Sequence, residues 1–275
     1  MLVTLKEILQ DAAEKHYAVG AFNLLNLEMA RGAIEAAREE RSPLILALAQ
    51  IHLPYLPFEY AGLIMRDLAA RADVPVCLHF DHGTDLDAIA LAAKAGFSSV
   101  MYDGSALPYE ENVRNTCEAV RLVGGQNVSV EAELGHVGGG EDGLDDGYAA
   151  NYTDPAQVRD FVERTGIAAL AVAIGTAHGK YLRPPVLSID LLAQIRGICS
   201  VPLVLHGGSG LSNDDFTSAI QNGISKVNIY TELAVAAQGG YTRGTGFEQS
   251  LLDAKNAVKE VARQKMRLFG SSGRV

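Results

Sequence analysis

VPVCLHFDHG, residues 74–83, contains the pattern from which the rest of this sequence can be interpreted. Its first five residues are apolar, and the run is too short and too β-branched to be a helix, so it predicts a buried strand. Asp81 and His82 therefore lie at the carboxyl end of that strand. Both side chains can bind ions or exchange protons, which makes this strand end a candidate functional position.

Two later stretches end in the same way. Ala168–Ile174 leads into a turn that contains His178, and Val201–Leu205 leads directly into His206. A single histidine after a strand is more often an ordinary loop residue than a ligand, but here three strands deliver an imidazole at the same end. Neutral imidazole is a common zinc ligand, and three protein ligands with an open fourth position characterise catalytic zinc sites. We predict that His82, His178 and His206 form a three-histidine metal site.

Segments of strand character alternate with segments of helical character along the chain. Eight strands are predicted, at residues 18–22, 43–49, 74–82, 98–103, 127–134, 168–174, 201–205 and 226–230. Amphipathic patterns predict helices between them, and residues 245–268 form a long helix after the last strand. Parallel strands joined by right-handed helical crossovers close best as a barrel. We therefore expect an α/β fold, with one (β/α)8 TIM-barrel domain over residues 1–275 and an additional C-terminal helix.

Composition and charge exclude several classes of protein. Hydrophobic residues make up 48% of the chain and charged residues 20%, so a large core is available and extended disorder is not expected. A net charge of −10 argues against a nucleic-acid partner, because phosphate backbones need a basic stripe. The three cysteines lack metal-binding spacing and are expected to be reduced thiols. With no signal-peptide pattern and no apolar run approaching roughly 18 residues, we expect a cytoplasmic protein without membrane contact.

A phosphate pocket is predicted after the last two strands, where TIM barrels often bind this group. Gly207-Gly208-Ser209-Gly210 follows the seventh strand, and Asn228 and Thr231 mark the end of the eighth. Glycine lets the backbone approach an anion closely, and the hydroxyls of Ser209 and Thr231 add donors. A lone GGSG is more often a tight turn, but its place beside the predicted metal ligands favours phosphate binding.

The predicted fifth strand carries an unusual pair of carboxylates. Glu131 and Glu133 are two residues apart, so both side chains point to the same face of the strand. Such a pair inside a barrel is costly unless cations or hydrogen-bond donors meet it. On the third strand, His79 points to the opposite face from Phe80. We expect it to contact the metal ligands without binding the metal itself.

Taken together, these motifs resemble one family, the class II, zinc-dependent ketose-bisphosphate aldolases, which act on fructose and tagatose bisphosphates. The resemblance covers nearly the whole chain. It rests on the motifs at residues 81–83, 130–135, 139–143, 175–179, 206–210 and 228–231.

The resemblance implies a role for each of these motifs. It implies that His82, His178 and His206 hold the catalytic zinc ion. Asp81 would be the proton donor to the aldehyde oxygen, and Glu141 would exchange the proton of dihydroxyacetone phosphate. Further matches are Asp103 and Glu133, for a second divalent or monovalent cation, and Gly179, Gly207, Gly208, Ser209, Asn228 and Thr231, for the phosphate and the enediolate.

The implied reaction is the reversible cleavage of a ketose 1-phosphate or 1,6-bisphosphate to dihydroxyacetone phosphate and an aldehyde. Breaking a carbon–carbon bond beside a carbonyl leaves an enediolate, which a Lewis acid stabilises. An aldolase that forms a Schiff base would need a well-placed buried lysine instead. Lys180 follows the predicted ligand His178, and Lys226 is predicted to open the eighth strand, so neither is well placed for that role. We also expect a homodimer or homotetramer, with subunit contacts on the C-terminal helix.

One departure from the family concerns the substrate. Many bisphosphate aldolases of this family carry Gln and Ser on the second strand, in a pattern like V-I-x-Q-x-S, where this chain has Ala47 and Ala49. The far end of the substrate loses two polar contacts, so a second phosphate is in doubt. Two other functions are a non-catalytic companion subunit of such an aldolase and a zinc-dependent barrel hydrolase. The complete set of predicted site residues argues against the first, and the lack of a metal-bridging lysine argues against the second.

Overall fold

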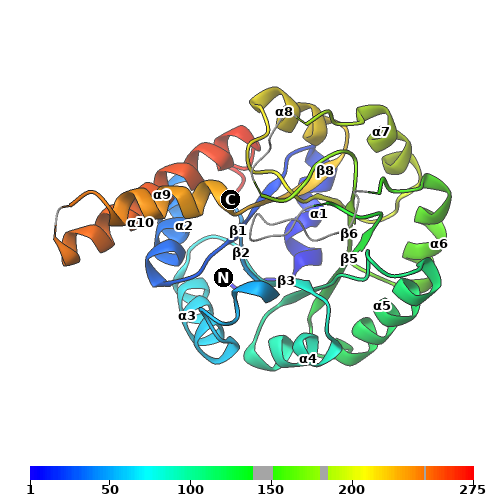
Figure 1. Cartoon of the computed structure of the whole chain (residues 1–275), viewed down its shortest axis with the longest axis horizontal. Helices are drawn as coiled ribbons and strands as arrows, with labels where there is room; N and C mark the ends of the chain where they lie inside the picture. Colours follow the sequence, from blue (N-terminus) through cyan, green and yellow to red (C-terminus); the bar gives the residue numbers. More distant parts are fainter. Residues whose placement is uncertain (139–150, 180–184, 245) are drawn as a thin grey trace.

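Eight parallel strands pair in chain order, and the ring closes where the eighth strand pairs with the first (Figure 1). The computed structural model describes residues 1–138, 151–179, 185–244 and 246–275. The strands are β1 (Val19–Asn23), β2 (Leu44–Ala49), β3 (Val76–Gly83), β4 (Ser99–Tyr102), β5 (Ser129–Leu134), β6 (Ala169–Val172), β7 (Leu203–Leu205) and β8 (Ile224–Ile229). This arrangement confirms the predicted (β/α)8 TIM barrel.

The helices are α1 (Leu5–Lys15), α2 (Leu27–Glu40), α3 (Phe58–Arg71), α4 (Leu86–Ala95), α5 (Tyr109–Val123), α6 (Pro155–Thr165), α7 (Ile189–Ile198), α8 (Asn213–Gln221), α9 (Thr231–Tyr241) and α10 (Phe247–Leu268), with a short 3-10 helix η1 (Gln50–His52) after β2. Helices α2 to α8 surround the barrel in chain order, whereas α1 lies across one end of the barrel and contacts several strands (Figure 1). The helix α10 is the additional C-terminal helix that the sequence predicts.

Local sequence signals explain where several helices begin. The side chain of Thr4 accepts a hydrogen bond from the backbone N–H of Glu7, and the Glu7 carboxylate accepts one from the backbone of Thr4, so α1 begins with a capping box. Asp154 caps α6, with Pro155 at its first position. The apolar face of α1, including Leu5 and Leu9, is buried together with inward-facing side chains of the strands.

Alternation along the strands divides the core into two parts. On β3, Cys77 belongs to the cluster that contains the apolar face of α1, whereas Phe80 belongs to the cluster between the strands and the outer helices. The ring of Phe80 packs edge-on against Phe58 at 4.9 Å between centroids. His79 therefore faces the barrel interior, as the alternation predicts, and it is fully buried there.

Strand β8 begins two residues earlier than the sequence predicts. It starts at Ile224, directly after Gly223, whose φ of 111° places it in a conformation that favours glycine. Lys226 is consequently the third residue of the strand rather than the first. Its side chain is fully buried.

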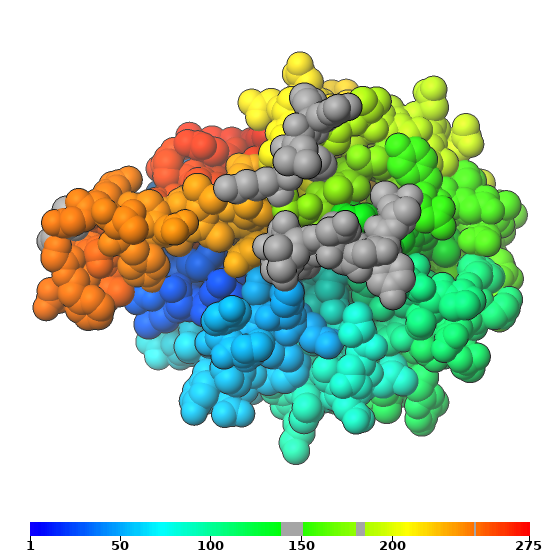
Figure 2. Space-filling model, in the orientation of Figure 1, coloured from blue at the N-terminus to red at the C-terminus, as the bar shows by residue number. Residues whose placement is uncertain are grey.

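The helices α9 and α10 pack on each other and project from one side of the barrel (Figures 1 and 2). The base of α10 is joined to α2 by ion pairs that include Lys255–Glu35 and Arg263–Glu40. Over the described residues, no helix is both long and apolar enough to cross a membrane.

Candidate active site

Three imidazoles from separate parts of the chain meet at the carboxyl end of the strands. His82 is the second-to-last residue of β3, His178 follows β6, and His206 comes directly after β7. One ring nitrogen from each lies within 4.8 Å of the others, which suits three ligands of one metal ion. The centroid of the His82 ring is 4.8 Å from that of His178 and 4.5 Å from that of His206.

An irregularity in β3 explains how two consecutive residues both reach this site. In a regular strand Asp81 and His82 would point to opposite faces. The pairing of β3 with β4 shifts register between Phe80 and Gly83, and His82 has a φ of 47°, in the left-handed region. This turn of the backbone directs the imidazole to the same end of the barrel as the inward-facing Asp81.

Two carboxylates orient two of the three rings. Asp103 Oδ2 lies 2.8 Å from Nδ1 of His82, so Nε2 is the nitrogen that this ring can offer to a metal. Glu131 Oε1 lies 2.9 Å from Nε2 of His206. The other nitrogen of His206, Nδ1, is buried and makes no hydrogen bond with any described residue. Ligating histidines typically make such outer hydrogen bonds, so the geometry fits a metal ion.

Asp81 is held mainly through one of its two carboxylate oxygens. Its Oδ2 accepts hydrogen bonds of 2.9 Å from the side-chain amides of Asn23 and Asn228, whereas Oδ1 makes no hydrogen bond with the described residues and has a longer contact of 3.5 Å with Nε2 of His79. Burial acts to raise the pKa of this carboxyl, but His82 and His79 hold the pKa well below its usual range. Asp81 therefore presents one ionised oxygen that can accept or return a proton.

Two further carboxylates lie close together beside the three imidazoles. Asp103 and Glu133 lie near His82, with ligand atoms within 4.8 Å of one another. Burial, together with the nearby charge of Asp103, raises the pKa of Glu133 to about 8. Its Oε1 accepts a 2.9 Å hydrogen bond from the backbone of Val137, and its Oε2 has no hydrogen-bond partner among the described residues. The buried carboxylate of Glu133 and the partly buried one of Asp103 resist ionising together, and they form a place that suits a cation.

The residues predicted to hold phosphate do lie together. They line one small cavity of about 20 Å³, which is bounded by Asn23, His178, Gly179, Gly207, Gly208, Ser209, Asn228, Tyr230 and Thr231. Gly207 has a φ of 67°, and a Cβ there would lie 2.5 Å from the carbonyl oxygen of Ala177, so glycine is required. The cavity also meets the first residue of α9, Thr231, and the N-terminus of a helix attracts anions.

Comparison with known proteins identifies the family. A family model for class-II fructose-bisphosphate aldolase matches residues 3–274. The chain belongs to this family. It is therefore a class II aldolase, a carbon–carbon lyase, and the resemblance drawn from its motifs is confirmed.

Its relatives in the family are similar over nearly their full length. A protein named 6-phospho-5-dehydro-2-deoxy-D-gluconate aldolase from Bacillus licheniformis is 42% identical, with 99% of this chain and 96% of that protein covered. A fructose-bisphosphate aldolase from Staphylococcus epidermidis is 39% identical, with 99% of each covered. The crystal structure of the YdjI aldolase from Escherichia coli K12 superposes with a TM-score of 0.91 at 41% identity, covering 100% of this chain and 99% of that one.

Some features of the aldolase site were missed from the sequence, and one predicted residue cannot be placed. Glu141 lies outside the described residues. Asn23 was missed, although a polar residue at the end of an apolar strand is the kind of signal that marked Asp81. Ala47 and Ala49 are fully buried and pair in register with His79 and Asp81, so they adjoin the site as expected.

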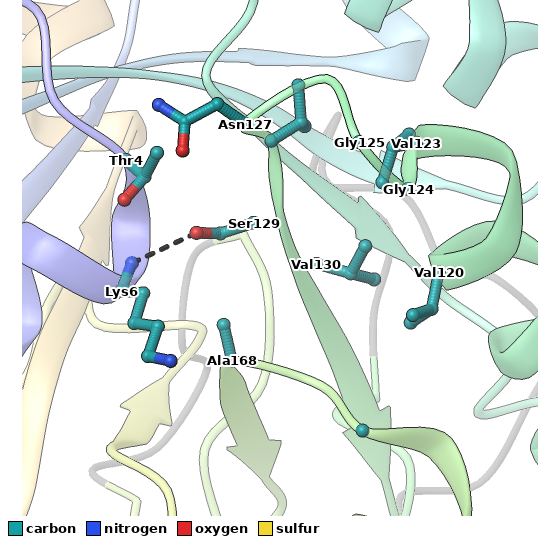
Figure 3. A pocket seen from close by; sticks show the side chains of 12 residues that line it. Thr4, Lys6, Val120, Val123, Gly124, Gly125, Asn127, Ser129, Val130 and Ala168 are labelled. Carbon is teal, nitrogen blue, oxygen red and sulfur yellow. Dashed lines mark hydrogen bonds between the residues drawn. The ribbon is translucent and has the colours of Figure 1, made fainter.

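A much larger cavity lies at the opposite end of the barrel. It has a volume of about 560 Å³ and is lined by the start of α1, the end of α5 and the first residues of β5 (Figure 3). There the backbone N–H of Lys6 donates a 3.1 Å hydrogen bond to Ser129. The described residues that line it include no histidine, cysteine or carboxylate. Catalytic sites of TIM barrels lie at the other face, so we assign the chemistry to the imidazole cluster.

Proposed function

We propose that this aldolase reversibly cleaves a ketose 1-phosphate or 1,6-bisphosphate to dihydroxyacetone phosphate and an aldehyde, with one zinc ion held by His82, His178 and His206. The observation that carries the proposal is the convergence of the three imidazoles, with Nδ1 of His206 buried and without a hydrogen-bond partner among the described residues. A zinc ion in this position supplies a Lewis acid that stabilises the negative charge developing beside the substrate carbonyl.

The proton transfer is assigned to Asp81. In the cleavage direction its carboxylate accepts the proton of the hydroxyl group whose carbon becomes the aldehyde, and in the reverse direction it returns that proton to the aldehyde oxygen. The amides of Asn23 and Asn228 fix Oδ2, so Oδ1 is the oxygen that moves the proton. By resemblance to the family, Glu141 exchanges the proton on dihydroxyacetone phosphate.

The phosphate of dihydroxyacetone phosphate is assigned to the small cavity beside His178. Backbone N–H groups in the glycine loop after β7 and at the start of α9 are suited to an anion there. Asp103 and Glu133 are assigned to a second cation, which would relieve the repulsion between their carboxylates. The aldehyde half is left open, because the relatives' names refer to different aldolase substrates.

The test is an assay of the purified chain with its metal content measured in parallel. We expect one zinc ion per chain and release of dihydroxyacetone phosphate from a panel of ketose phosphates, detected through a coupled dehydrogenase. A chelator should abolish turnover, and added zinc should restore it. Borohydride with substrate should trap no adduct. Full activity in chelator would contradict the metal assignment, and a zinc-loaded chain inactive on the whole panel would indicate a companion subunit.

A further inference from the structure

A buried ion pair crosses the barrel interior behind the imidazoles. Lys226 on β8 and Glu131 on β5 are both fully buried, and the ammonium nitrogen lies 3.0 Å from Oε1 and 2.9 Å from Oε2 of the carboxylate. The two strands are not neighbours in the sheet. A fully buried lysine is rare because its charge loses its hydration, so this one needs a structural or functional reason.

The carboxylate connects this lysine to a predicted metal ligand. Glu131 Oε1, which faces the ammonium of Lys226, also lies 2.9 Å from Nε2 of His206. A hydrogen bond from Nε2 fixes the ring and leaves Nδ1 to face the site. The orientation of His206 therefore depends on the position of a carboxylate that Lys226 holds from the other side.

The same ammonium also meets the side of the site that holds Asp81. It lies 3.4 Å from Nε2 of His79, which is itself 3.5 Å from Oδ1 of Asp81. The other nitrogen of His79 lies 2.8 Å from the hydroxyl of Ser99. His79, Asp81 and Glu131 have ligand atoms close enough to surround a cation, and the ammonium of Lys226 already contacts two of the three.

We propose that Lys226 is a positioning residue for the metal centre, which holds Glu131 so that Glu131 holds His206 with Nδ1 directed at the metal ion. The inference rests on the proposed zinc site. Without the ammonium, Glu131 loses the contact with both of its oxygens, so the carboxylate can move and its hydrogen bond no longer fixes the imidazole of His206. The lysine acts through other residues and forms no bond with substrate.

The experiment compares zinc affinity with folding stability in Lys226→Met, Glu131→Gln and the double variant. Zinc dissociation constants are measured by competition with a chromogenic chelator, and the free energy of unfolding of the metal-free chain is measured in urea. We expect Lys226→Met to weaken zinc binding about 10- to 100-fold, the usual effect of losing an outer partner of a ligand. The double variant should recover stability, because it leaves no unpaired buried charge, but should not recover zinc affinity.

The control is Lys265→Met, which removes another buried lysine that pairs with Glu232 at 2.8 Å, and which should leave zinc affinity unchanged. Zinc affinity at the wild-type level in Lys226→Met would overturn the proposal. Recovery of affinity together with stability in the double variant would also overturn it, by showing that Lys226 serves folding alone. If Lys226→Met does not fold, wild-type affinity in the double variant has the same meaning. A wild-type chain that binds no zinc would overturn the proposed function as well.

Discussion

Replacing Asp81 tests the proton transfer separately from zinc binding. Its carboxylate is assigned the proton transfer, and the loss of one such group typically lowers turnover by about 10²- to 10⁴-fold. We expect Asp81→Ala to show a fall in kcat of this size while zinc content stays at one per chain. Steady-state kinetics and metal analysis on the same preparation provide the measurement. Asp87→Ala, an exposed acid on α4, is the control, and near wild-type cleavage by Asp81→Ala would remove Asp81 from the mechanism.

The residues that could be predicted share one property, namely that their role follows from position along the chain. His82, His178 and His206 each follow an apolar strand, and parallel strands bring such ends together. The partnership of Lys226 with Glu131 could not be predicted, because β5 and β8 are not adjacent and contacts across a barrel depend on the stagger of its strands. The left-handed backbone conformation at His82 could not be predicted either, because positive φ is uncommon outside glycine and nothing in the sequence marks which residue adopts it.

Helix α10 is attached to the barrel by charge as well as by apolar packing. Glu40, the last residue of α2, accepts hydrogen bonds from Arg267 and Arg263 on α10. The hydrogen bond from Arg267 is the main cause that lowers the pKa of Glu40 from 4.5 to about 2, against the opposing effect of burial. A carboxyl with a lowered pKa in the folded state stabilises the fold at neutral pH, and this contribution is lost as the pH falls from about 4.5 toward 2.

We therefore expect Glu40→Gln to lower the free energy of unfolding by about 1 to 2 kcal/mol at pH 7, a value reduced by solvent screening of the partly exposed arginines. The difference from wild type should shrink as the pH falls below 4.5. Urea denaturation at pH 7, 4.5 and 3 measures it. Glu39→Gln removes a more exposed carboxylate that pairs with Lys259, and its effect should stay within about 0.5 kcal/mol. A loss for Glu40→Gln that does not change with pH would contradict the assignment to charge.

The second strand sets the expectation for the far end of the substrate. Ala47 and Ala49 provide no side-chain donor beside His79 and Asp81, and a buried phosphate without donors is costly. We expect the enzyme to accept an unphosphorylated or carboxylated aldehyde. The measurement is kcat/KM for a ketose 1-phosphate and for its 1,6-bisphosphate. A preference of about a hundredfold for the bisphosphate, equal to roughly 2.7 kcal/mol, would show that other residues hold the second phosphate.

The sequence predicted the type and order of the helices and strands better than their first and last residues. All eight strands and the long α10 were expected, because alternation and helical periodicity extend over many residues. The short η1 was missed, since three residues carry no periodicity. The predicted start of β8 at Lys226 was two residues late, and the ion pair with Glu131 allows the charge of Lys226 inside the strand.

The projecting pair of helices sets the expectation for assembly. Val235 on α9 and Phe247 and Leu252 on α10 are 52%, 74% and 44% exposed. Apolar side chains on a projecting element suit contact with a second copy of the chain. We expect light scattering to give two or four times the chain mass of 29.2 kDa, and Phe247→Asp to lower that mass at equal concentration. Val186→Asp, at an 83% exposed position elsewhere, should not change it. A wild-type mass of 29.2 kDa would contradict the expectation.

The closure of the barrel determines when in folding the site can form. β1 and β8 lie near opposite ends of the chain, and their pairing is the contact of longest sequence separation in the sheet. Such pairing carries a large loop-closure cost and forms slowly. Asp81 receives one amide from each of these strands, through Asn23 and Asn228. A nascent chain therefore cannot orient the carboxylate of Asp81 until the final strand has been synthesised and the ring of strands has closed.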